Sequence, residues 1–111
     1  MSSDKSDRAL AAIEYHISLV NEFTKGLDIT TFGADLRTLY AVTRCLEIIS
    51  EASRKLPPET KARHPEVPWT QIAGAGNVYR HDYEDVSAQS IWKTANEEIR
   101  SLERAVAAEL G

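Results

Sequence analysis

The residues best suited to chemistry in this 111-residue chain gather in one stretch, residues 74–83. Asn77, Arg80 and His81 supply an amide, a guanidinium and an imidazole, and two tyrosines lie in the same stretch. Imidazole is the side chain whose ordinary pKa, about 6.5, suits proton transfer near neutral pH. A guanidinium presents a fixed fork of donors that matches phosphate or carboxylate. These residues indicate a site that moves protons and holds an anionic group.

The spacing of these three residues favours one helix face. Residues three and four apart share a face, so Asn77, Arg80 and His81 lie within a sector of about 100°. Ala73 and Gly74 fall on the same face, and their small side chains leave room for a ligand. The alternative interpretation is structural, because Asn, His and Tyr near the C-terminal end of a helix also serve as capping groups.

Length and composition restrict the class of protein. The chain is expected to form a single domain, residues 1–111, with a flexible N-terminal arm over residues 1–6. Cys45 is the only cysteine, which leaves no disulfide framework, and with three scattered histidines it makes no structural zinc site. No apolar run approaches the roughly 20 residues that span a bilayer. We therefore expect a cytoplasmic protein without metal or cofactor.

The formal net charge of −4 argues against a protein that coats nucleic acid through bulk charge. A small basic cleft stays compatible with this composition. Nor does the Gly74-Ala75-Gly76 run make a dinucleotide-binding fingerprint, because no strand precedes it and a third glycine is absent.

Apolar periodicity predicts an all-α fold, a four- to five-helix antiparallel bundle. The expected main helices span residues 7–25, 32–56, 68–81 and 87–110. The apolar stripe of the first helix is predicted to consist of Leu10, Ile13, Ile17, Val20 and Phe23, and that of the last helix of Ile91, Ala95, Ile99, Leu102 and Val106. The expected connections are a linker at 27–31, a proline-rich segment at 57–68 that holds a helical turn at 59–63, and a turn at 82–86. Gly26 ends the first helix and Ser87 caps the last.

The helix predicted at 32–56 has an apolar arc of roughly 180°, wider than a surface helix needs. It should pack on more than one neighbour, and a second copy of the chain is one candidate. Its polar half is predicted to contain Thr43, Arg44, Glu47, Ser50, Glu51 and Arg54. Arg44 and Glu47 have two interpretations: members of a solvated ion-pair ladder, or residues that line a cleft beside His81.

Two glycines and two histidines have local interpretations. Gly74 and Gly76 each cost about 0.8–1 kcal/mol relative to alanine inside a helix, so a neighbour should approach closely there. His16 should point inward, either as a hydrogen-bonded core or interface histidine or as a residue near the active site. His64 precedes a proline and is interpreted as a solvated loop residue.

The combination of three motifs resembles the HepT-like ribonuclease toxins of the HEPN superfamily. The motifs are Glu-Ile-Ile-x-Glu-Ala at 47–52, Pro-Trp-x-x-Ile-Ala-Gly at 68–74 and His-x-Tyr at 81–83. The resemblance extends over nearly the whole chain. It implies a homodimer whose composite cleft cleaves RNA without a metal.

The resemblance also implies roles for individual residues. Asn77, His81 and Tyr83 match the family's site, whereas the family's arginine falls on Gly76 here. We expect Arg80, one helical turn later, to take the arginine's part. The implied partner is a small nucleotidyltransferase antitoxin of the MntA type that attaches AMP to Tyr83. The alternative is a catalytically inactive helical module that keeps the dimer and the partner surface.

Overall fold

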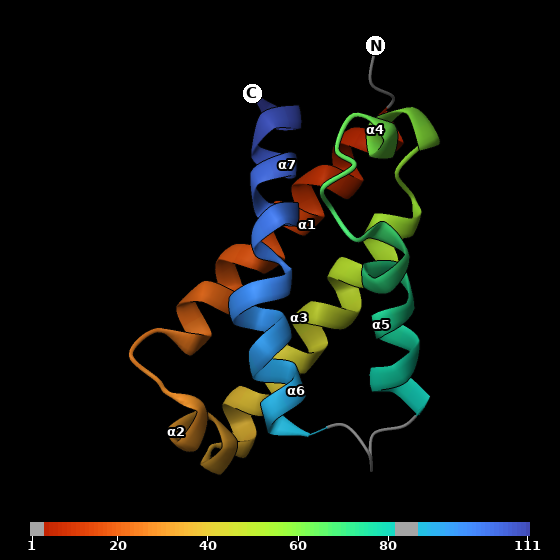
Figure 1. Cartoon of the computed structure of the whole chain (residues 1–111). Coiled ribbons are helices and arrows are strands. Elements are labelled where there is room, and N and C mark those ends of the chain that lie inside the picture. Colours follow the sequence, from red (N-terminus) through yellow and green to blue (C-terminus); the bar gives the residue numbers. More distant parts are fainter. Residues whose placement is uncertain (1–3, 82–86) are drawn as a thin grey trace.

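The computed structural model describes residues 4–81 and 87–111, with side chains described for 5–76 and 87–111. The described residues form helices and connections, with no strand among them. The elements are α1 (Asp4–Thr24), α2 (Ile29–Ala34), α3 (Leu36–Arg54), α4 (Pro58–Ala62), α5 (Trp69–His81), α6 (Ala88–Lys93), the π-helical segment η1 (Thr94–Glu98) and α7 (Arg100–Leu110). The long rods of the bundle are α1, α3, α5 and the continuous run α6–η1–α7. Figure 1 shows that consecutive rods point in opposite directions. The predicted all-α bundle is confirmed.

Helix α3 lies at the centre of the bundle. It contacts α1 and α5 most extensively and also meets α2 and α6. The prediction that its wide apolar arc packs on several neighbours is therefore confirmed. The apolar stripe predicted for the last rod is buried as well, and it consists of Ile91, Ala95, Ile99, Leu102 and Val106.

The first helix begins earlier than expected. Helix α1 starts at Asp4, and Ser6 is only 4% exposed, so residues 4–6 belong to the helix rather than to a flexible arm. At the other end Gly26 has a φ of +78°, the left-handed conformation that commonly follows a helix and that glycine adopts without strain. Phe23, assigned to the apolar stripe, is 37% exposed.

The prediction of one continuous helix over residues 32–56 is wrong, because Asp35 breaks it between α2 and α3. Asp28 caps α2 by accepting the Thr31 N–H at 2.8 Å. Asp35 has an extended ψ of 94° and caps α3, accepting the Thr38 N–H at 3.2 Å and its hydroxyl at 2.8 Å. These bonds lower the pKa of both carboxyls. The linker predicted at 27–31 thus contains the start of a short helix.

The last rod contains a wide turn that periodicity alone does not reveal. Ser87 caps α6 as predicted, accepting the Ser90 N–H at 3.0 Å. After Lys93 the helix widens into the π-helical η1, and α7 continues from Arg100. Such an inserted turn rotates the faces of the helix that follows it.

The proline-rich connector is fastened to the end of α7, which corrects the interpretation of His64. Its ring Nε2 lies 2.7 Å from Glu109 Oε2, and its side chain is 14% exposed. Arg63 donates to both carboxylate oxygens of Glu109, at 2.9 and 2.7 Å. His64 is therefore a partly buried ion-pair residue. The predicted turn at 59–63 appears as α4.

Within the described ranges, no helix has both the length and the apolar character needed to cross a membrane.

Candidate functional site

Helix α5 carries the predicted site. It runs without interruption from Trp69 to His81, so the positions of Asn77, Arg80 and His81 share one helix as the spacing predicts. The side chains of residues 77–81 lie outside the described part of the structure. Tyr83 and the turn predicted at 82–86 also lie outside the described residues.

A serine fixes α5 against α3. The Ser50 hydroxyl donates to the Ala73 carbonyl oxygen at 2.9 Å and accepts the Gly76 N–H at 3.0 Å. Ser50 is 1% exposed, so its assignment to the polar half of the helix is wrong. A buried hydroxyl with both a donor and an acceptor partner ties the two backbones together.

The close approach predicted at the glycines occurs at Gly76. A Cβ atom there would lie 2.8 Å from Ser50 Oγ and 3.0 Å from Ser50 Cβ, distances at which atoms must shift. Only glycine fits this crossing in the described geometry. Position 76 therefore faces the interior of the bundle, and an arginine would have no room at this position while Ser50 is present.

Gly74 does not show the predicted close approach. It is exposed, and a Cβ atom there would meet nothing within 4 Å. On a helical wheel Gly74 lies only about 20° from His81 and about 160° from Gly76. The face that holds positions 77, 80 and 81 thus runs from the α3 side of α5 to its open side. Space for a ligand next to His81 is consistent with this arrangement.

Arg44 and Glu47 lie on α3, and Glu47 borders α5 at Gly76. Arg44 Nη1 is 3.6 Å from Glu47 Oε2, and the two side chains are 66% and 18% exposed. The Glu47 carbonyl oxygen lies 3.6 Å from the place a Cβ would take at Gly76. The ion pair between Arg44 and Glu47 is thus observed, whereas a cleft beside His81 stays a prediction.

Other candidate groups are engaged elsewhere. His16 Nδ1 lies 2.7 Å from the Ala12 carbonyl oxygen within α1, which matches the predicted hydrogen-bonded histidine. Burial raises the pKa of the Cys45 thiol, which keeps this cysteine neutral and unreactive near pH 7. Among the described residues no group of three or more His, Cys, Asp or Glu side chains could hold a metal.

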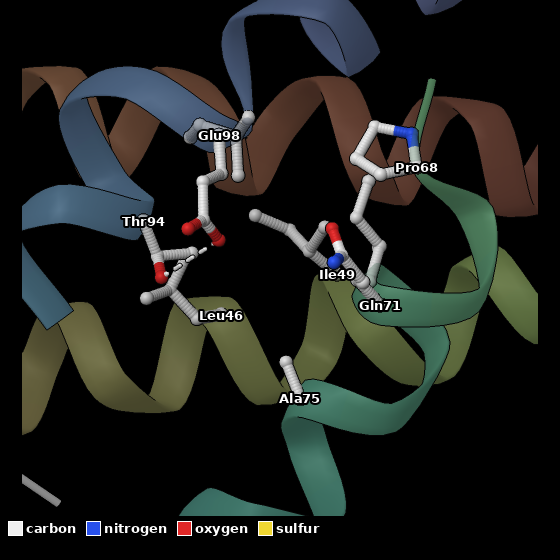
Figure 2. Close-up of a pocket in the computed structure, with 9 residues that line it drawn as sticks. Leu46, Ile49, Pro68, Gln71, Ala75, Thr94 and Glu98 are labelled. Atoms are coloured by element: carbon white, nitrogen blue, oxygen red, sulfur yellow. Dashed lines mark hydrogen bonds between the residues drawn. The ribbon is translucent and has the colours of Figure 1, made fainter. Parts of the chain in front are cut away.

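A separate cavity lies between α3, α5 and η1. Figure 2 shows Glu98 and Thr94 on one side of it and Gln71 and Pro68 on the other, with Ala75 below. Its α5 residues occupy the flank opposite positions 77, 80 and 81. A volume of about 20 Å³ holds roughly one water molecule. This cavity is therefore distinct from the predicted site and too small for an organic substrate.

Sequence reasoning missed Ser50, the residue that fixes the orientation of α5. A serine at the edge of the polar half is compatible with either solvent or a small-residue helix contact. The costly glycines predicted the contact on α5, but nothing in the sequence identified its partner on α3.

The fold and the predicted site define an all-helical bundle with a polar helix end next to its central helix. Comparison with known proteins shows the family to which the chain belongs. Residues 13–109 match the family described as Ribonuclease HepT-like. The chain belongs to the HepT-like ribonuclease family, within the HEPN superfamily that the three motifs indicate.

Several curated relatives have related names. The chain is 42% identical over 86 residues to a probable ribonuclease HepT from Thermococcus cleftensis, covering 78% of each chain. It is 34% identical over 92 residues to a putative RNase from Methanocaldococcus jannaschii, covering 83% of this chain and 75% of the relative. It is also 40% identical over 85 residues to a putative RNase from Caldanaerobacter subterraneus, covering 77% and 76%. No solved structure matches the chain at a significant level.

Proposed function

We propose that this protein is a metal-independent endoribonuclease whose active site contains Asn77, Arg80 and His81 in a cleft between two copies of the chain. The family match over residues 13–109 carries the ribonuclease part of this proposal. The uninterrupted helix α5 supports the choice of residues, because it keeps all three positions on one face.

The chemistry follows from the three groups. His81 accepts the proton of a ribose 2′-hydroxyl, and the resulting oxygen forms a bond to the neighbouring phosphorus. The bond from phosphorus to the leaving 5′-oxygen breaks, and water donates the proton that this oxygen takes up. Arg80 stabilises the charge on the phosphoryl oxygens, and Asn77 orients the phosphate. The products are a cyclic 2′,3′-phosphate and a free 5′-hydroxyl.

The packing at Gly76 supports the choice of Arg80. Because Ser50 fills the space beside Gly76, a guanidinium for this face must come from another position. Position 80 lies one turn further along α5 and about 40° around the helix from Gly76. Arg80 is the arginine in the sequence of α5, and it can supply a guanidinium to this face without occupying position 76.

We further propose that the protein is the toxin of a toxin–antitoxin pair. Its partner is a nucleotidyltransferase antitoxin of the MntA type, which transfers AMP to the Tyr83 hydroxyl. An adenylate beside His81 would compete with RNA phosphate for the same donors. Mass spectrometry of the protein expressed with and without the partner tests this step. An unmodified Tyr83 in both samples would contradict it.

The central experiment is RNA cleavage by the purified protein in excess EDTA. We expect cleavage that persists in EDTA and leaves cyclic phosphate ends, together with growth arrest when the protein is expressed alone. Cleavage that EDTA abolishes would contradict the metal-independent mechanism.

A second candidate function is a catalytically inactive helical module that binds the same partner. The observation in its favour is the glycine at position 76, where the family carries an arginine. A wild-type protein that binds the nucleotidyltransferase but cuts no RNA would favour this function.

A further inference from the structure

Three residues on the first half of α3 form a stripe that the proposed chemistry does not use. Arg37, Tyr40 and Arg44, called here the α3 stripe, are spaced three and four residues apart and lie within about 60° of one another. Tyr40 is 73% exposed, the side chain of Arg44 is 66% exposed, and Arg37 is exposed. A phenol flanked by two guanidiniums is thus presented to solvent along one helix face.

The α3 stripe lies toward the same end of the bundle as the predicted site. From the contact between Ser50 and Gly76, α5 continues for about 7.5 Å to His81, and α3 extends back for about 15 Å to Tyr40. Figure 1 shows that the start of α3 and the end of α5 lie toward the same end of the molecule. A strand that binds along the stripe would therefore lie at the end of the bundle that holds the end of α5.

The side chains of the α3 stripe indicate which kind of molecule it binds. Proteins that bind single-stranded nucleic acid combine cationic groups that contact the backbone with aromatic rings on which bases stack. The two guanidiniums complement phosphates, and an exposed phenol offers a stacking surface. In a two-fold symmetric contact with a second copy this face would tend to meet itself and bring like charges together. Charge complementarity thus favours a polyanion.

We propose that the α3 stripe binds single-stranded RNA and leads it to the site on α5, with Tyr40 stacked on a base and Arg37 and Arg44 on phosphates. This inference rests on the proposed ribonuclease function and extends it to the form of the substrate. Arg44 forms an ion pair with Glu47, with 3.6 Å between Nη1 and Oε2, which partly offsets its attraction for phosphate. Substitution of Arg37 is therefore the clearer test of the electrostatic contribution to binding.

The test measures binding without cleavage. The probe is a short, fluorescein-labelled 2′-deoxyoligonucleotide of mixed sequence, which lacks the attacking 2′-hydroxyl but keeps bases and phosphates. Fluorescence anisotropy with the full-length protein should show Tyr40→Ala weakening binding roughly 5- to 100-fold, the effect expected for loss of one stacked base. Tyr40→Phe should keep the affinity, and Tyr40→Leu should lose it.

Matched controls come from the same chain. Tyr15 is 59% exposed on α1, so Tyr15→Ala should bind like the wild type. Arg37→Ala should lower the slope of log affinity against log salt concentration by about 0.7, and Arg54→Ala at the far end of α3 should not.

Three outcomes would overturn the inference: a wild type that does not bind the probe, a Tyr40→Ala variant that binds like Tyr15→Ala, or a Tyr40→Leu variant that binds like the wild type. Light scattering that shows Tyr40→Ala converting a dimer to a monomer would instead assign this face to a second copy. A wild type that binds through Tyr40 but cuts no RNA would support the stripe and contradict the proposed enzyme.

Discussion

The chain contains the dipeptide Arg-His twice, and the two copies have different surroundings. Arg63-His64 lies after α4, and both side chains bind Glu109 at the end of α7. Arg80-His81 ends α5, whose face runs from the contact with α3 to the open side beside Gly74. The first copy fastens a connector to the bundle, and the second is the proposed catalytic pair.

If the second pair is catalytic as proposed, residue type alone does not separate a structural pair from a catalytic one. Glu109 neutralises the first pair: the hydrogen bonds from Arg63 and then His64 lower the pKa of its carboxyl to about 2. Both side chains of this pair thus bind the end of α7, which favours a structural role for them. The predictions that follow test whether the two pairs differ as proposed.

The largest expected effect is on the second histidine. His81→Ala should lower the rate of RNA cleavage by about 10²- to 10⁴-fold, because it removes the proposed proton carrier. The matched variant His64→Ala should cut RNA at the wild-type rate per folded molecule and lose about 1 kcal/mol of stability. Cleavage assays and urea denaturation of both variants check this. Equal loss of cleavage in the two variants would contradict the proposed difference between His81 and His64.

Arg80 and Arg63 should also differ in how much their substitution lowers RNA cleavage. Arg80→Ala should lower kcat by about 10²- to 10³-fold, the effect expected for loss of a charge-stabilising donor. Arg80→Lys should recover part of the activity, because it keeps the charge without the planar fork. Arg63→Ala serves as the control and should keep kcat. Steady-state kinetics on one RNA substrate measure all three, and a fully active Arg80→Ala would remove Arg80 from the site.

The contact between Gly76 on α5 and Ser50 on α3 gives a prediction about stability. Gly76→Ala should destabilise the fold by about 1–3 kcal/mol, because the new Cβ atom overlaps Ser50. In a Ser50→Gly background the same substitution should cost less, since both close atoms are then absent. A double-mutant cycle by urea denaturation should give a coupling energy of about 1 kcal/mol or more. Additive effects would contradict the packing described at this crossing.

The smallest effect concerns the first pair and depends on pH. Glu109→Gln should cost about 1 kcal/mol at pH 7, because charge-assisted hydrogen bonds are lost. The native pKa of Glu109, about 2, lies below its ordinary value of 4.5, so this stabilisation is complete above pH 4.5. It should shrink as the pH falls from 4.5 toward 2. Thermal unfolding of both proteins across this range would show the difference, and a gap as large at pH 2 as at pH 7 would contradict the assignment.

Much of the fold was predictable because long amphipathic helices leave a clear period in the sequence. The stripe on the last rod, the Ser87 cap and the glycine after α1 were all predicted from local rules. The break at Asp35 was missed although its capping chemistry is local, because the apolar pattern runs across it. The π-helical η1 was missed because one wide turn hardly changes a hydrophobic period.

The candidate site was predictable in part. The sequence by itself determined the order of the helices, the family motifs and the placement of Asn77, Arg80 and His81 on one helix face, because these depend on spacing along a single element. Only the tertiary structure decided that Ser50 is buried against Gly76 and that Arg63 and His64 bind Glu109. The Ser50–Gly76 contact joins residues 26 positions apart in the sequence, and the His64–Glu109 contact joins residues 45 positions apart. A chain fixes such pairs only when its helices pack, so no local pattern could reveal them.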